Sequence, residues 1–408
     1  MVRGGVAALR LPGTRVVATM AGASLVAAGV AFIVNILSAR VLGPEYRGHV
    51  ALVLQLAYVI APLLGAGADR ALLRPEKDRA REHYLLPSLV GMLTGSGLVA
   101  LFIWLVYGPW AALAALVAIV TVSFNLFRSV AISSGRQLPY LCAFLLYQAS
   151  ILIETVVLTA AGVQAWQWWA GVYLVPGIFL AAYALRRVRR DSPLPVAGPW
   201  AALRSNGALL AASISSLIVL RFERVILPVL AGAEALGLFI VVATATEPLY
   251  WVAQALADQR TSSSMTGAPR HRRQLVAASV RDAAFFAPLG IVGGIVLALV
   301  LVPLFGEAYA PAGELIFPLV VAAILLALYR QASGRLLGSS LPNRLGAAET
   351  ATASAALIIY PCAILLAGAT GAAWGSVLVY AVGWAAAIVA YPPSTPETSC
   401  SLSKENTA

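Results

Sequence analysis

The stretch Phe285–Leu304, FFAPLGIVGGIVLALVLVPL, contains no charged side chain. As a helix it would be about 30 Å long, which is the thickness of the hydrocarbon core of a bilayer. Similar apolar runs recur along the whole chain, of which 60% is hydrophobic and only 11% charged. Soluble domains carry roughly 25% charged residues, and membrane barrels show shorter, alternating segments. The sequence therefore predicts an all-α integral membrane protein.

The runs predict about twelve transmembrane helices. These are expected at residues 16–38, 48–68, 84–107, 110–133, 139–162, 165–185, 207–230, 235–257, 276–304, 311–329, 345–368 and 372–391. Most Arg and Lys residues, Arg330 and Arg335 among them, then fall in alternate connecting segments, whereas Arg40 and Arg47 fall in an exterior loop. By the positive-inside rule this predicts a multi-pass protein of the cell membrane with both termini in the cytoplasm.

The connecting segments are too short to hold a soluble domain. The longest polar stretch, Asp69–His83, is far below the roughly 40 residues that an independently folding unit needs. The net charge of +11 is distributed over these short segments, so it indicates membrane topology and not binding to nucleic acid. We expect neither a separate catalytic head nor a nucleic-acid partner.

An internal repeat divides the chain. A constant offset of 189 residues relates Gly43 to Gly232, Glu45 to Glu234, Gly48 to Gly237 and Asp69 to Asp258. The matched helices have the same predicted orientation, which favours two six-helix bundles related by a pseudo-two-fold axis along the membrane normal. We expect the bundles at 1–190 and 205–391, a cytoplasmic linker at 191–204 and a disordered cytoplasmic tail at 392–408.

Three motifs carry a family resemblance. Ser38–Gly48 reads SARVLGPEYRG, Phe222–Leu227 is followed by Leu236–Phe239 in the second half, and Leu304–Tyr309 reads LFGEAY. Together they resemble the polysaccharide (O-antigen, lipid-linked oligosaccharide) flippases of the multidrug/oligosaccharidyl-lipid/polysaccharide exporter superfamily. Two departures are Phe239, where Tyr is usual, and Glu223, where Asp is commoner. The resemblance implies a two-bundle, alternating-access transporter of undecaprenyl-pyrophosphate-linked sugars.

Arg221 and Arg224 are candidate substrate-binding residues. They lie three residues apart on one face of a predicted transmembrane helix, and a charge in hydrocarbon costs at least about 2.5 kcal/mol. One interpretation is that their guanidinium groups bind the pyrophosphate of the substrate, which suits the planar geometry of Arg. The alternative is that Arg224 reaches the exterior interface and Arg221 pairs with a structural carboxylate.

Three carboxylates lie at membrane depth. Glu154 and Glu247 fall inside predicted helices, and Glu223 is a neighbour of both arginines. Such groups either partner a buried arginine or carry H+ or Na+, and both roles stay open here. Arg40, just past the first helix, either receives an anionic head group or serves as an interfacial anchor.

No catalytic, metal or nucleotide-binding motif accompanies these residues. His49, His83 and His271 lack metal-ligand spacing, and no Walker A sequence occurs. We therefore expect a protein that is not an enzyme and has no cofactor, and energy from an ion gradient or from the substrate gradient.

The expected function is translocation of lipid-linked oligosaccharide units for surface polysaccharide biosynthesis. Expected partners are membrane lipid, a polysaccharide polymerase and glycosyltransferases, and we expect a monomer. A lipid II flippase and a drug exporter of the same superfamily are alternatives. An exporter of cations would need an acidic cavity, and Arg221 and Arg224 argue against it.

Overall fold

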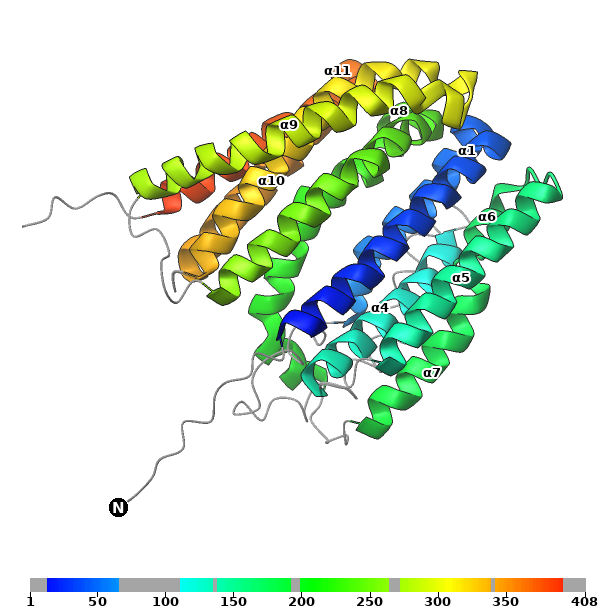
Figure 1. Cartoon of the computed structure of the whole chain (residues 1–408), viewed down its shortest axis with the longest axis horizontal. Helices are drawn as coiled ribbons and strands as arrows, with labels where there is room; N and C mark the ends of the chain where they lie inside the picture. The colour runs from blue at the N-terminus through cyan, green and yellow to red at the C-terminus, as the bar shows by residue number, and fades with distance from the viewer. Residues whose placement is uncertain are drawn as a thin grey trace, which may run out of the picture. The chain divides into compact units, whose positions relative to one another are not determined.

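All regular elements in the described part of the chain are helices, as predicted (Figure 1). The computed structural model describes residues 13–65, 111–134, 138–191, 199–263, 272–338 and 342–391. The elements are α1 (Gly13–Gly65), α4 (Ala111–Ser134), α5 (Leu138–Ala160), α6 (Trp166–Gly171), α7 (Val175–Asp191), α8 (Pro199–Ser263), α9 (Arg272–Phe305), the 3-10 helix η2 (Glu307–Leu315), α10 (Ile316–Gly338) and α11 (Pro342–Ala390). Eight helical segments of these residues are long and apolar enough to cross a membrane.

Three of the long helices contain a sharp break. Gly43 in α1 has φ 69° and ψ 177°, and Gly232 in α8 has φ 88° and ψ 163°. In α11 the break falls at Ala367 and Gly368. Glycine adopts positive φ without a steric penalty, and Pro44 suits the first position of the helix that follows Gly43. The exterior loops expected at 39–47 and 231–234 are therefore wrong. These residues are helical except for one glycine in each segment.

Other predicted boundaries differ as well. The helix expected at 165–185 is divided into α6 and α7, and the helix expected at 311–329 begins as η2 and continues in α10 to Gly338. Arg330 and Arg335 accordingly lie inside a helix and not in a connecting segment. The helix expected at 84–107 lies outside the described residues, so the count of twelve stays a prediction.

The chain forms two compact units. Unit 1 comprises residues 1–217, 224–245 and 300–313, and unit 2 comprises 218–223, 246–299 and 314–408. Three segments of the second half, 205–217, 224–245 and 300–313, group with unit 1. The bundles expected at 1–190 and 205–391 stay a prediction. The expected linker at 191–204 lies partly outside the described residues, and α8 begins within it at Pro199.

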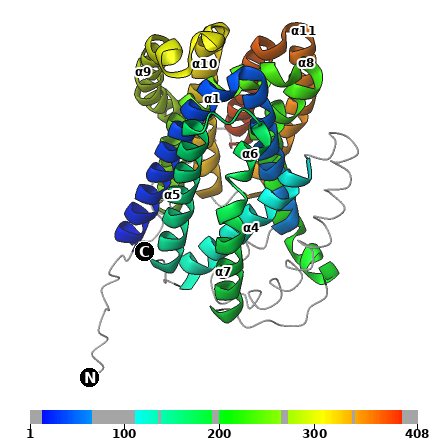
Figure 2. The same ribbon diagram turned by 90° about the vertical axis from the view of Figure 1, so that its right-hand side faces the viewer.

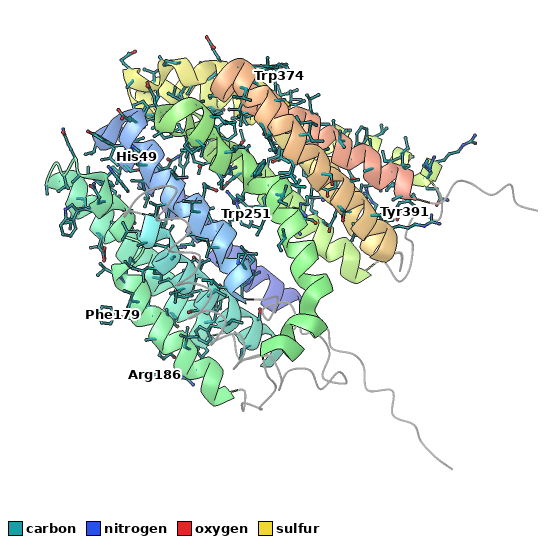
Figure 3. The ribbon with its side chains drawn as sticks, turned by 180° about the vertical axis from the view of Figure 1, so that it is seen from behind. His49, Phe179, Arg186, Trp251, Trp374 and Tyr391 are labelled. Carbon is teal, nitrogen blue, oxygen red and sulfur yellow. The ribbon has the colours of Figure 1, made fainter. Side chains whose placement is uncertain are left out.

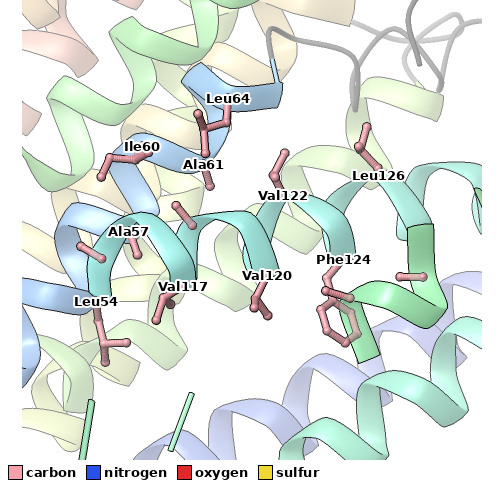
Figure 4. Close-up of a cluster of buried hydrophobic side chains, with 14 of the residues drawn as sticks. Leu54, Ala57, Ile60, Ala61, Leu64, Val117, Val120, Val122, Phe124 and Leu126 are labelled. Carbon is pink, nitrogen blue, oxygen red and sulfur yellow. The ribbon is translucent and has the colours of Figure 1, made fainter. Parts of the chain in front are cut away.

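The core of unit 1 is made by α1 and α4. Figure 4 shows Leu54, Ala57 and Ile60 of α1 with Val117 and Val120 of α4, all of them buried. In the same unit α1 also packs on α5 and α6, and α7 packs on α4 and α5 (Figure 2). This apolar packing supports the polar groups described below.

Large apolar side chains also cover outward faces. On α7, Phe179 is 75% exposed and lies on the outer side of the helix (Figure 3). On α9, the exposed residues Leu289, Val292, Val296 and Leu299 follow one another at intervals of three or four and so share one face. Water would disfavour apolar faces of this extent, whereas lipid would not. These faces accord with a protein that spans a membrane.

Candidate functional site

A buried arginine lies at the centre of a polar cluster in unit 1. Arg47 is only 5% exposed, and its Nε and Nη2 donate to the side-chain oxygen of Asn35 at 3.1 and 2.8 Å. In a straight helix these residues, twelve positions apart, would be about 18 Å apart. The break at Gly43 reverses the chain and brings them together. Placing Arg47 in an exterior loop was therefore wrong.

Tyrosines surround this arginine. The phenol groups of Tyr173 and Tyr309 interact electrostatically with Arg47, and Tyr309 is completely buried. The hydroxyl of Tyr147 donates to the backbone oxygen of Tyr173 at 2.9 Å. The motif LFGEAY thus supplies a buried phenol through Tyr309.

Glu154 lies near Tyr147, one of these tyrosines. It interacts electrostatically with Tyr147 on α5 and is partly exposed. It forms no hydrogen bond or ion pair with the other described residues of the chain. An isolated carboxylate in an apolar helix is better suited to binding and releasing a proton than one that an arginine holds ionised.

Arg40 makes a defined contact at the end of a helix. Its Nε donates to the backbone oxygen of Leu304 at 2.7 Å, and its Nη2 donates to that of Pro303. These oxygens lie in the last turn of α9, where a cation is favoured by the helix dipole. Because the side chain is also exposed, both interpretations of Arg40, head-group receptor and interfacial anchor, stay predictions.

In unit 2, Arg221 pairs with a carboxylate of the same helix. Its Nη1 lies 3.3 Å from Oε1 of Glu247, and the two side chains are 22% and 24% exposed. They are separated by 26 positions of α8, and the break at Gly232 is required for their contact. The sequence left open which carboxylate would pair with Arg221, and the structure identifies Glu247.

The neighbouring charged residues are buried more deeply. Glu223 is 1% and Arg224 is 8% exposed. Glu223 belongs to unit 2, where it interacts electrostatically with Tyr360 of α11, whereas Arg224 belongs to unit 1. The two arginines of the predicted pair thus differ in solvent exposure, because Arg221 is partly exposed and Arg224 is buried.

A second ionic cluster in unit 2 was missed by the sequence analysis. Arg335 of α10 pairs with Asp282 of α9 at 2.6 Å, and both side chains are buried. One turn away, Arg330 lies over the rings of Tyr250 and Tyr329 and interacts electrostatically with Glu349. Hydropathy placed both arginines in a solvated segment, because the sequence around an arginine does not show that a carboxylate of another helix lies beside it.

Solved structures of transporters resemble this chain. The lipid II flippase MurJ in an inward closed conformation aligns with a TM-score of 0.64 at 12% identity, over 90% of this chain and 86% of MurJ. An inward-facing multidrug resistance MATE family transporter of the MOP superfamily aligns with a TM-score of 0.64 at 16% identity, over 89% and 92%. The eukaryotic MATE transporter AtDTX14 aligns with a TM-score of 0.57 at 14% identity, over 92% and 94%.

These likenesses show the fold. No family model and no curated protein sequence match the chain. The helical membrane fold predicted from the sequence agrees with the fold of these neighbours, whereas membership of the superfamily and of its polysaccharide subfamily remains a prediction.

Proposed function

We propose that this chain is an alternating-access transporter that moves polyprenyl-pyrophosphate-linked oligosaccharide units across the cell membrane. The fold over most of the chain, the apolar outer faces and the family motifs support a transporter of a lipid-linked substrate. The observation that carries the substrate class is the partly exposed Arg221 at membrane depth, held by Glu247 at 3.3 Å. A guanidinium that water can reach is available to an anionic ligand, whereas a fully buried ion pair is not.

Glu247 and the substrate compete for Arg221 in this mechanism. A pyrophosphate binds the guanidinium more strongly than one carboxylate oxygen does, because it carries more charge and two of its oxygens accept two parallel hydrogen bonds. Glu247 then loses its cation, and a carboxylate without a counter-ion in an apolar segment binds a proton more readily. Substrate binding at Arg221 is thereby coupled to protonation of Glu247. When the substrate leaves, Glu247 returns its proton and pairs with Arg221 again.

The test is transport in proteoliposomes with a fluorescent polyprenyl-pyrophosphate disaccharide. The variants Arg221→Ala and Arg221→Lys should both lose translocation, with Lys the milder because it retains charge but not the two-pronged geometry. In cells, lipid-linked units should accumulate on the inner leaflet. Normal translocation by a stably folded Arg221→Ala, Arg224→Ala double variant would refute the proposal.

A matched control separates binding from folding. Arg281 is an exposed arginine of α9 in the same unit, so Arg281→Ala should leave both the yield of folded protein and transport unchanged. If Arg221 serves only to neutralise Glu247, Arg221→Ala should lower the yield of folded protein, and adding Glu247→Gln should restore both yield and transport. Restored yield without transport supports the substrate role.

A lipid II flippase is the second candidate, favoured by the likeness to MurJ. Its substrate is also a polyprenyl-pyrophosphate-linked sugar, so the same arginine chemistry applies. Competition between unlabelled lipid II and an oligosaccharide-linked lipid in the proteoliposome assay discriminates the two. Preferential inhibition by lipid II would replace the first candidate.

A further inference from the structure

Three buried hydrogen-bond donors of unit 1 have no partner among the described residues of the chain. They are Nη1 of Arg47, the side-chain nitrogen of Asn35 and the hydroxyl of Tyr309. The three residues come from both sides of the break in α1 and from η2, and all are at most 5% exposed. Buried polar groups in native proteins almost always have a partner, so three such donors in one cluster indicate a place where a ligand can bind.

The hydrogen-bonding capacity of these three groups determines what kind of ligand can satisfy them. The Nε and Nη2 atoms of Arg47 both use the oxygen of Asn35, which leaves Nη1 on the opposite edge of the guanidinium. The nitrogen of Asn35 only donates, and the phenol of Tyr309 both donates and accepts. Two of the three groups can therefore be satisfied only by an acceptor.

Charge distinguishes an anion from a water molecule. No described Asp or Glu pairs with Arg47, and its electrostatic neighbours are the phenols of Tyr173 and Tyr309. A water molecule would satisfy hydrogen bonds but would leave the guanidinium charge buried without a counter-ion, which is costly. An anion supplies both an acceptor and the opposite charge.

We propose that Arg47, Asn35 and Tyr309 form a binding site for a small inorganic anion of the size of chloride. The burial of all three residues excludes a bulky headgroup from this site. The anion connects the two arms of α1 on either side of Gly43 with the start of η2, and so stabilises the contacts at this end of unit 1. The site uses neither Arg221 nor Glu247, and it does not depend on the proposed function.

The test is the thermal stability of the purified full chain in chloride and in gluconate at equal ionic strength. We expect a higher midpoint of unfolding in chloride that saturates with its concentration, because a ligand of the native state stabilises it by mass action. Tyr309→Phe should weaken the apparent chloride affinity about tenfold or more, as for loss of one hydrogen bond to a charged group. Tyr46→Phe removes the same hydroxyl from an exposed neighbour of Arg47 and should change nothing.

A second variant supplies the negative charge from the protein itself, so that Arg47 no longer needs a bound anion. Asn35→Asp places a carboxylate where the amide oxygen already accepts from Arg47, so this variant should remain folded and lose its response to chloride. In crystals grown with bromide, an anomalous peak should lie beside Nη1 of Arg47 in the natural protein and be missing in Asn35→Asp. Equal stability in chloride and gluconate, or a full chloride response in Asn35→Asp, would overturn the proposal.

Discussion

Arg335, Arg221 and Arg47 differ in the group that neutralises them. Arg335 has a carboxylate at 2.6 Å in a buried environment, Arg221 has one at 3.3 Å with partial exposure, and Arg47 has an amide and phenols. Arginine stays protonated under all ordinary conditions, so each of these sites must contain or admit negative charge. The fully buried pair is suited to holding structure, and the partly exposed pair is suited to exchange with a ligand.

Removing one partner of the buried pair should be strongly destabilising. Asp282→Asn removes the carboxylate that pairs with the buried Arg335, and breaking such a buried pair costs about 3–5 kcal/mol. We expect a large loss of folded protein and a lower midpoint of unfolding in detergent. The combined replacement Asp282→Leu, Arg335→Met should recover much of that loss, because an apolar pair needs no neutralisation.

The control for this pair is the adjacent residue. Arg281 is exposed, so Arg281→Gln should change the midpoint of unfolding little. A midpoint in Asp282→Asn equal to that of Arg281→Gln would mean that the pair contributes nothing to stability.

Glu247 and Glu154 should affect the pH dependence of transport differently. Glu247→Gln removes the group that competes for Arg221, so substrate should bind tighter while transport loses its response to pH. Glu154→Gln should abolish the pH response only if Glu154 is the proton carrier, since it has no described ionic partner. Transport measured from pH 5.5 to 8.5 in proteoliposomes decides between them. Full pH dependence in both variants would show that neither residue carries the proton.

Two glycines permit close contact between helices of unit 1. A Cβ atom added to Gly48 would lie 1.8 Å from the backbone oxygen of Ala233, and one added to Gly237 would lie 1.8 Å from that of Pro44. The same offset of 189 residues relates Gly48 to Gly237 and Pro44 to Ala233. The two contacts are therefore reciprocal, which is what a two-fold relation between the repeats predicts.

Gly48→Ala should force these helices apart. Overpacking of this kind costs about 1–3 kcal/mol, and contact with backbone leaves little room for relief. We expect a lower midpoint of unfolding in detergent and reduced transport. Gly29→Ala is the control, because Gly29 lies in the same helix and has no atom within 4 Å of the added Cβ. Equal stability of the two variants would contradict the close contact.

At the scale of the whole molecule, the prediction concerns topology. The charge distribution predicts that the end of α8 faces the cytoplasm and that the segment containing Glu307 faces outward. Single cysteines at Ser263 and Ala308, in a background without Cys142, Cys362 and Cys400, should react with an impermeant reagent from opposite sides. Reaction from the same side would refute the twelve-helix topology.

The sequence alone was sufficient to predict the class of protein, because hydropathy depends only on local composition. A bilayer accepts only runs of apolar residues whose backbone bonds are satisfied internally, so a helical membrane protein could be derived before any contact was known. The glycines at 43 and 232 were also recognisable, as repeated residues with a special backbone role. The candidate residues Arg221 and Glu247 followed from the cost of charge in lipid.

Only the tertiary structure decided which charges meet. Arg335 and Asp282 lie on different helices, and Arg47 reaches Asn35 only because α1 reverses at Gly43. From local sequence Arg47, Arg330 and Arg335 looked solvated, so one expected helix began only after Arg47 and another ended before Arg330. The energy of a buried charge depends on partners brought close by the fold, so no local pattern contains that information.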